Sequence, residues 1–220
     1  MGKEIDLLVN YPKTKRNLEE RATSKTEADR AIARQFGRDF FDGDRNHGYG
    51  GFNYLPRFWQ PVIPTFQQHW NLDRSSSILD VGCAKGFMMH DLVELIPGIT
   101  VKGIDISEYA IENSKEEIKG RLQLGNATSL PFEDHSFDFV YSITTLHNLH
   151  CYDLDKALRE IERVGKKNKY ICVESYRNEV EKANLLYWQV TCEAFCTPKE
   201  WEWWFKMTGF NGDYSFIYFE

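Results

Sequence analysis

Residues 78–92 constrain the fold of this chain more than any other stretch. The apolar residues Ile78, Leu79 and Val81 are typical of a buried strand, and a small-residue turn, 82–86, follows directly. An amphipathic segment then begins at Phe87. A strand, a tight turn and a helix bring backbone close to a nucleotide-like ligand, because only small residues leave room for it. The stretch predicts an α/β sheet with such a ligand at the turn.

A second predicted strand places a carboxylate at the same edge of the sheet. Residues 101–106 are mostly apolar and include Asp105, about twenty residues after the glycine turn. A carboxylate at this position can accept hydrogen bonds from both hydroxyls of a ribose. The alternative for Asp105 is a helix cap ahead of Ser107. A nucleoside-containing cofactor is the first interpretation.

Strands and amphipathic helices alternate through the rest of the chain, which favours an α/β fold with a parallel sheet and helices on both faces. Residues 185–195 fit a helix or a strand, and their β-branched and aromatic residues favour a strand; a helix from Thr197 to Gly209 follows. The other expected strands are 121–124, 137–143, 170–175 and 214–219, which with 185–195 and the two strands above make seven. The other expected helices are 107–119 and 153–164.

Residues 1–70 are interpreted as an N-terminal helical segment and lid, and residues 71–220 as the ligand-binding domain. A capping box at Ser24 or Thr26 predicts a helix that ends at Gly37, and the apolar residues of 57–70 predict a second helix that starts near Pro61. The loop 40–54 is rich in glycine and aromatic residues and has no regular period. We take 40–59 as the lid; the alternative is packing over the sheet edge. Its candidate ligand contacts are Arg45, Tyr49, Tyr54 and Arg57.

Composition excludes several classes of partner. The 27 Lys and Arg against 33 Asp and Glu give a net charge of −6, and nucleic-acid binding depends on clustered cations, so nucleic acid is not expected. The N-terminus has no apolar core for a signal peptide, and no stretch approaches the roughly 18 apolar residues of a membrane span. The five scattered cysteines are most simply reduced thiols in a cytoplasmic protein, without a metal site.

Four motifs between residues 78 and 175 occur in the order typical of class I S-adenosylmethionine-dependent methyltransferases, which this region resembles. They are the turn 80–86, Asp105, the segment 125–132, and the strand 137–142 followed by Leu146 and His147. The resemblance implies a Rossmann-like, doubly wound, mostly parallel seven-stranded sheet with an antiparallel C-terminal edge strand. It also implies S-adenosylmethionine as cofactor and S-adenosylhomocysteine as product.

The resemblance implies a role for each cofactor residue. Gly82, Cys83 and Ala84 bring backbone to the methionine moiety, and Asp80 reaches its ammonium group. Asp105 binds the ribose, Ile106 and Ala127 enclose the adenine with Leu130, and Asn126 accepts from the adenine amino group. Ser142, Tyr49 and Arg57 complete the cofactor contacts. Two residues depart from the pattern: Ala84 replaces a glycine, and Asn126 replaces an aspartate and lacks its charge.

On the acceptor side, His147 is the candidate general base, because histidine titrates near neutrality; a packing residue is the alternative. The candidate substrate contacts are Arg45, Tyr54, His150 and Glu174. His147 and His150 could form a metal pair, but no third ligand is evident, so no metal is expected. The expected function is methyl transfer to an O or N atom of a small molecule, such as a sugar or secondary metabolite.

Two alternatives stay open: a non-catalytic or non-methylating binder of S-adenosylmethionine, and a nicotinamide oxidoreductase. The acceptor and the oligomeric state do not follow from the sequence.

Overall fold

A six-stranded parallel sheet forms the centre of the computed structural model, which describes residues 2–13, 24–48 and 53–220. The strand order is β3-β2-β1-β4-β5-β6, and every pairing is parallel. Because the order reverses between β1 and β4, their carboxyl ends meet where open α/β sheets bind ligands. The strands are β1 (Ser77–Val81), β2 (Thr100–Asp105), β3 (Leu122–Leu124), β4 (Phe137–Ile143), β5 (Gly165–Glu174) and β6 (Asp213–Ile217).

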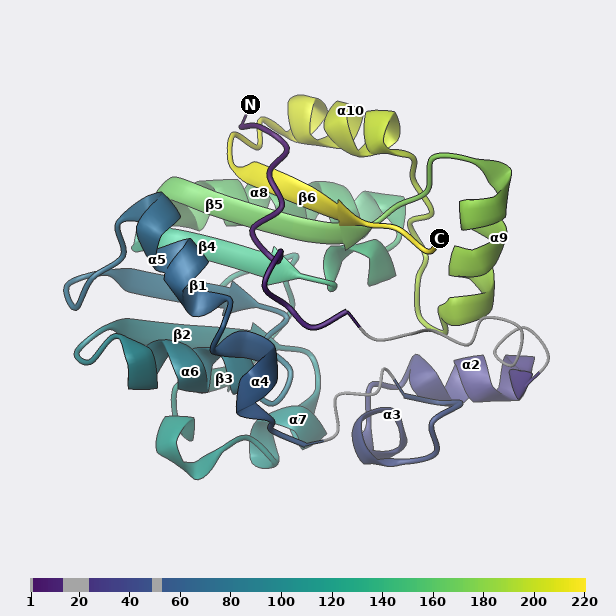
Figure 1. Ribbon diagram of the computed structural model, residues 1–220, viewed down its shortest axis with the longest axis horizontal. Helices are drawn as coiled ribbons and strands as arrows, with labels where there is room; N and C mark the ends of the chain where they lie inside the picture. The colour runs from purple at the N-terminus through teal and green to yellow at the C-terminus, as the bar shows by residue number, and fades with distance from the viewer. Residues whose placement is uncertain (1, 14–23, 49–52) are drawn as a thin grey trace.

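Helices cover both faces of the sheet (Figure 1). Side chains alternate between the faces along each strand, so that Ile78 of β1 joins one apolar core and Leu79 the other. α5 (Ile63–Trp70) and α6 (Phe87–Leu95) cover the first face, and α8 (Cys151–Val164) and α10 (Pro198–Thr208) cover the second. The expected helices at 153–164 and 197–209 are confirmed. None of the described helices is long and apolar enough to cross a membrane.

The N-terminal part lies against this domain in three places. Residues 3–5 run beside β6, where the Ile5 amide donates to the Tyr214 carbonyl at 2.8 Å. α2 (Glu27–Ala33) and α3 (Arg38–Asp42) lie beyond the carboxyl ends of the strands, with α9 (Glu179–Trp188) close to α2 (Figure 1). α4 (Pro56–Trp59) contacts α6.

The predicted strand over 185–195 is wrong. The Asn178 side chain accepts from the amides of Val180 and Glu181, and this cap starts α9, which reaches Trp188. The β-branched pair Val190–Thr191 follows in a segment without regular structure. The sheet of the described residues therefore has six strands instead of seven.

Four further expectations need correction. The C-terminal edge strand is parallel: β6 pairs with β5 in the same direction, with Tyr170 opposite Asp213. The helix expected from 57–70, started near Pro61, is α5, which begins at Ile63, but residues 56–59 form a separate helix, α4, since Pro61 does not continue it. The helix expected over 107–119 is a short α7 (Glu108–Glu112) and a 3₁₀ turn (Glu116–Ile118), and the loop expected from residue 40 begins inside α3.

Candidate cofactor and acceptor site

The turn between β1 and α6 presents backbone at the sheet edge. Gly82, Ala84 and Gly86 are left-handed, with φ of +85°, +49° and +71°. A Cβ on Gly82 would lie 2.1 Å from Thr145 Oγ1, so only glycine fits there. Ala84 adopts the same region with its methyl group, a conformation that costs an L-residue about 1–2 kcal/mol. The turn accommodates this departure from the glycine pattern.

Asp105 connects the turn to the segment after β2. Its Oδ2 accepts from the Ala84 amide at 2.7 Å and its Oδ1 from the Ser107 amide at 2.9 Å. Burial raises the pKa of Asp105, and the two amides oppose the rise. Ser107, not Asp105, is the cap of α7, accepting from the Ala110 amide at 3.1 Å. Each Asp105 oxygen keeps a second lone pair for a ribose hydroxyl.

Asp80 is a buried carboxyl group just before the turn. The register places Tyr141 opposite Asp80, and the Tyr141 hydroxyl donates to Asp80 Oδ2 at 2.8 Å. Burial raises the pKa of Asp80 to about 8; the Tyr141 hydroxyl opposes the rise and the Asp105 charge adds to it. The group is therefore mostly protonated at pH 7. Sequence reasoning missed Tyr141, whose alignment with Asp80 needs the register.

The carboxyl ends of β2 and β3 offer apolar surface. Ile106 is 57% exposed and Leu124 is 53% exposed. Ala127 packs, half-buried, against the apolar core that includes Leu130. Asn126 is exposed, and its side-chain oxygen accepts from the Thr128 amide at 3.0 Å, which leaves a second lone pair on that oxygen.

Two predicted cofactor residues lie inside the fold. Ser142 is fully buried and donates to the Val81 carbonyl at 2.8 Å. Cys83 is 6% exposed, and burial raises the pKa of its thiol well above the usual value. Both side chains pack the strands against each other, so contact between Cys83 and a ligand is left to its backbone.

His147 lies in a 3₁₀ turn (Leu146–Asn148) after β4 and is buried beside Glu174 at the end of β5. Its Nε2 is 3.6 Å from Glu174 Oε2, and its Nδ1 faces the Glu174 amide at 3.5 Å. Burial lowers the pKa of His147 to about 3. The ring is therefore neutral at physiological pH and is a weak base.

Residues 189–194 cover these two side chains. Gln189 donates to the Glu174 carboxylate, and Thr191 donates to Asn148 Oδ1 at 2.8 Å. The amides of Glu193 and Ala194 both donate to the His147 carbonyl at 2.9 Å. Sequence reasoning missed Gln189, because the segment was taken for a strand.

α2 holds the same segment from the other side. Arg30 donates to the Gln189 carbonyl at 2.6 Å, and Arg34 Nε lies 3.2 Å from Glu193 Oε1. His150 is exposed, with its Nδ1 3.7 Å from the other Glu193 oxygen. The structure therefore separates exposed His150 from buried His147 and places His150 beside Glu193, in the segment 189–194.

The predicted lid contacts are dispersed. Arg45 and Arg57 are exposed, with the Arg57 guanidinium 5.1 Å from the Phe58 ring centre, and Tyr49 lies outside the described residues. Tyr54 instead binds α6: its hydroxyl donates to Asp91 Oδ1 at 2.5 Å, and Lys115 Nζ lies 4.0 Å from its ring centre. Tyr54 and Arg57 thus contact different residues, Asp91 and Phe58.

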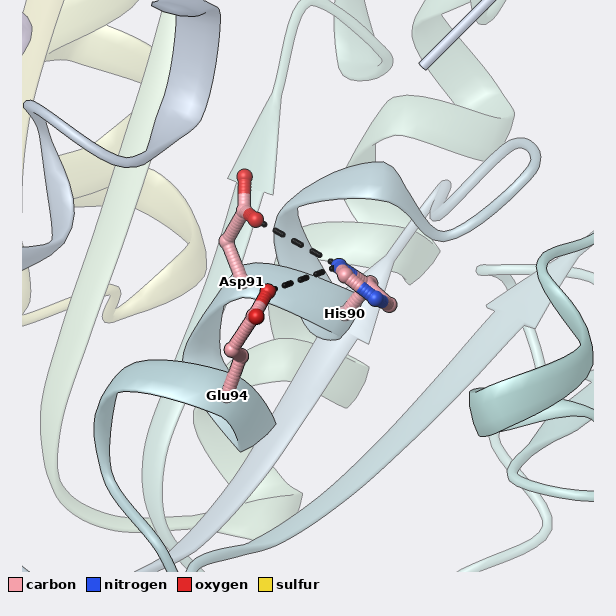
Figure 2. A group of neighbouring side chains, drawn as sticks. All are labelled: His90, Asp91 and Glu94. Carbon is pink, nitrogen blue, oxygen red and sulfur yellow. Dashed lines mark hydrogen bonds and ion pairs between the residues drawn. The ribbon is translucent and has the colours of Figure 1, made fainter. Parts of the chain in front are cut away.

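Figure 2 shows one oxygen of Asp91 and one of Glu94 directed at the same nitrogen of His90. Their ligand atoms lie within 4.8 Å of one another, so this group of the described residues could hold a metal ion. The second Asp91 oxygen, which is buried without a partner among the described residues, points away from the group (Figure 2). Since Tyr54 and Gln60 also donate to Asp91, the cluster fastens residues 54–60 to α6.

Comparison with known proteins identifies the family. A family model described as a methyltransferase domain matches residues 72–209, which is more than half of the chain. The chain belongs to this methyltransferase family. Two proteins named demethylmenaquinone methyltransferase are similar to it. The one from Symbiobacterium thermophilum is 28% identical over 70% of this chain and 66% of its own length, just under two thirds. The one from Staphylococcus aureus is 30% identical over 68% of this chain and 70% of its own length.

Solved structures agree on the fold. The YcgJ protein from Bacillus subtilis superposes with a TM-score of 0.55 over 66% of each chain, at 22% identity. Methyltransferases of this class use S-adenosylmethionine, and the predicted class I resemblance is confirmed. The carboxyl groups at the turn fit that cofactor, because Asp80 is a buried acid with no cation beside it among the described residues, and Asp105 keeps lone pairs beside an open apolar surface.

Proposed function

We propose that this methyltransferase transfers a methyl group from S-adenosylmethionine to an O or N atom of a small polar molecule, such as a sugar or a secondary metabolite. The observation that carries the cofactor part is the pair of carboxyl groups, Asp80 and Asp105, on either side of a left-handed turn. One is a buried acid suited to an ammonium group, and the other accepts from two amides and suits a ribose.

Each residue of the turn then has a role in binding. The backbone of Gly82, Cys83 and Ala84 contacts the methionine moiety, and Asp80 ionises to hold its ammonium group. Asp105 accepts from the ribose hydroxyls. Ile106 and Ala127 enclose the adenine, and Asn126 accepts from its amino group. When bound, the cofactor supplies an electrophilic methyl group on a sulfonium sulfur.

We assign the acceptor site to the carboxyl ends of β4 and β5, beneath residues 189–194 and α2. Both nitrogens of His147 already face Glu174, and a ring with a pKa near 3 abstracts protons poorly. His147 therefore orients Glu174 in this proposal, and Glu174 binds the polar acceptor. Much of the rate then comes from alignment and exclusion of water, for which the N-terminal segment 1–70 serves as cover.

The test is release of S-adenosylhomocysteine with a panel of hydroxyl and amine acceptors. The names of the relatives make demethylmenaquinone the first specific acceptor to include. Turnover with a member of the panel supports the proposal. Cofactor binding without turnover on any acceptor favours the alternative, a non-methylating binder.

A binding variant tests the cofactor assignment separately. Asp105→Ala removes charge-assisted hydrogen bonds worth roughly 1.5–3 kcal/mol, so S-adenosylhomocysteine should bind about ten- to a hundredfold more weakly. Asp155→Asn is the matched control, since Asp155 pairs with Arg159 one turn along the outer face of α8. Unchanged affinity in Asp105→Ala would remove the ribose role.

A further inference from the structure

The last residue of α3, Asp42, reaches from the N-terminal segment into the glycine turn. Both of its carboxylate oxygens lie 2.6 Å from Lys85 Nζ, and the Tyr109 hydroxyl donates to Oδ2 at 2.7 Å. The Lys85 side chain is 6% exposed and that of Asp42 is 28% exposed, so this ion pair is largely shielded from water. The hydrogen bonds from Lys85 and Tyr109 overcome the effect of burial and lower the pKa of Asp42.

The two partners of Asp42 flank the ribose carboxylate. Lys85 directly follows Ala84, whose amide donates to Asp105 Oδ2. Tyr109 lies in the first turn of α7, which Ser107 caps, and the Ser107 amide donates to Asp105 Oδ1. Asp42 therefore bridges the two chain segments that hold Asp105.

Other contacts of the same segment reinforce this bridge. The Ser107 hydroxyl donates to the Phe36 carbonyl at 2.5 Å. Phe40 and Phe41 of α3 are buried in an apolar cluster against which Ala84 packs. Figure 1 shows α3 beside α7 at the carboxyl ends of the strands. Displacing α3 would thus expose the glycine turn and, at the same time, break the contacts of Asp42 with Lys85 and Tyr109.

We propose that Asp42 is a positioning residue of the cofactor site, which fixes the glycine turn against α7 and makes retention of the cofactor depend on the docked N-terminal segment. The inference rests on the proposed cofactor binding. Loss of the Asp42 charge removes the counter-charge that Asp42 places beside the shielded Lys85 ammonium, and this loss destabilises the docked state. The turn and α7 are then free to separate, and the cofactor escapes sooner.

The experiment measures S-adenosylhomocysteine dissociation by stopped-flow fluorescence from the full-length protein. Asp42→Asn should raise the dissociation rate constant about tenfold, whereas Asp42→Glu, which keeps the charge, should stay within about threefold of wild type. Asp39→Asn is the matched control, because Asp39 lies on the same helix and pairs at the surface with Arg38. A residue with a merely structural role would lower the unfolding midpoint and leave this rate constant unchanged.

Three results would overturn the inference. They are an unchanged rate constant in Asp42→Asn, an equal increase in Asp39→Asn, and no recovery in Asp42→Glu. If wild type binds no S-adenosylhomocysteine, the proposed function fails first and the inference with it. Should Asp42→Asn not fold, Tyr109→Phe keeps the ion pair and tests the same bridge: dissociation about threefold faster supports it, and an unchanged rate constant contradicts it.

Discussion

Gly82→Ala should destabilise the protein through two separable effects. The left-handed φ of +85° costs an L-residue about 1–2 kcal/mol. The added Cβ would also lie 2.1 Å from Thr145 Oγ1 and 2.3 Å from Thr145 Cγ2, and overpacking of this kind costs about 1–3 kcal/mol. We therefore expect the free energy of unfolding, measured by urea denaturation of the ligand-free protein, to fall by roughly 2–5 kcal/mol.

Two other glycines isolate the backbone part. Gly120 and Gly209 have φ of +87° and +76°, and a Cβ on either would meet none of the described atoms within 4 Å. Their alanine variants should each lose only about 1–2 kcal/mol. Thr145→Gly removes the atoms that the new Cβ would meet, so in the double variant the steric loss of stability should disappear. A double-mutant cycle should show this as a coupling energy of about 1–3 kcal/mol. Equal losses at all three glycines, with no coupling to Thr145, would refute the reasoning.

Three further predictions concern single side chains. Asp80 has a folded-state pKa near 8, above its usual value of 3.8, so the ligand-free protein should lose stability from about pH 4 to pH 8; in Asp80→Asn this loss should be much smaller, and an identical pH profile would contradict the burial of the charge. The His147 ring should stay neutral at pH 5 by NMR titration, because burial lowers its pKa to about 3; a midpoint near 6.5 would show an accessible ring. Tyr54→Phe removes the hydroxyl that donates to buried Asp91, so it should lower the free energy of unfolding by about 1–3 kcal/mol, and no change by urea denaturation would show that Tyr54 does not fasten the segment to α6.

The central part of the fold could be predicted from local sequence. β1 and β4 are mostly apolar because helices cover both of their faces, and the small residues of the turn 82–86 indicate its tight backbone. Asp80 and Asp105 were found because each stands at a fixed place relative to a strand. The resemblance to the methyltransferase family added the cofactor.

The rest depends on tertiary contacts that no local pattern encodes. The direction of β6 is set by its pairing with β5 and the N-terminal residues, not by its own composition. The segment 185–195 has strand-like residues, yet the Asn178 cap begins a helix through its first half. The ion pair between Lys85 and Asp42 joins residues 43 positions apart, so the packing of α3 against the turn could not be predicted from local sequence.

The most direct test of cofactor binding is calorimetric titration of the cofactor-stripped protein with S-adenosylmethionine, S-adenosylhomocysteine and NAD at pH 7, repeated in buffers of different ionisation enthalpy. The account predicts micromolar binding of the first two and none of NAD, with release of a proton as Asp80 ionises against the ammonium group. Binding of NAD alone would contradict it.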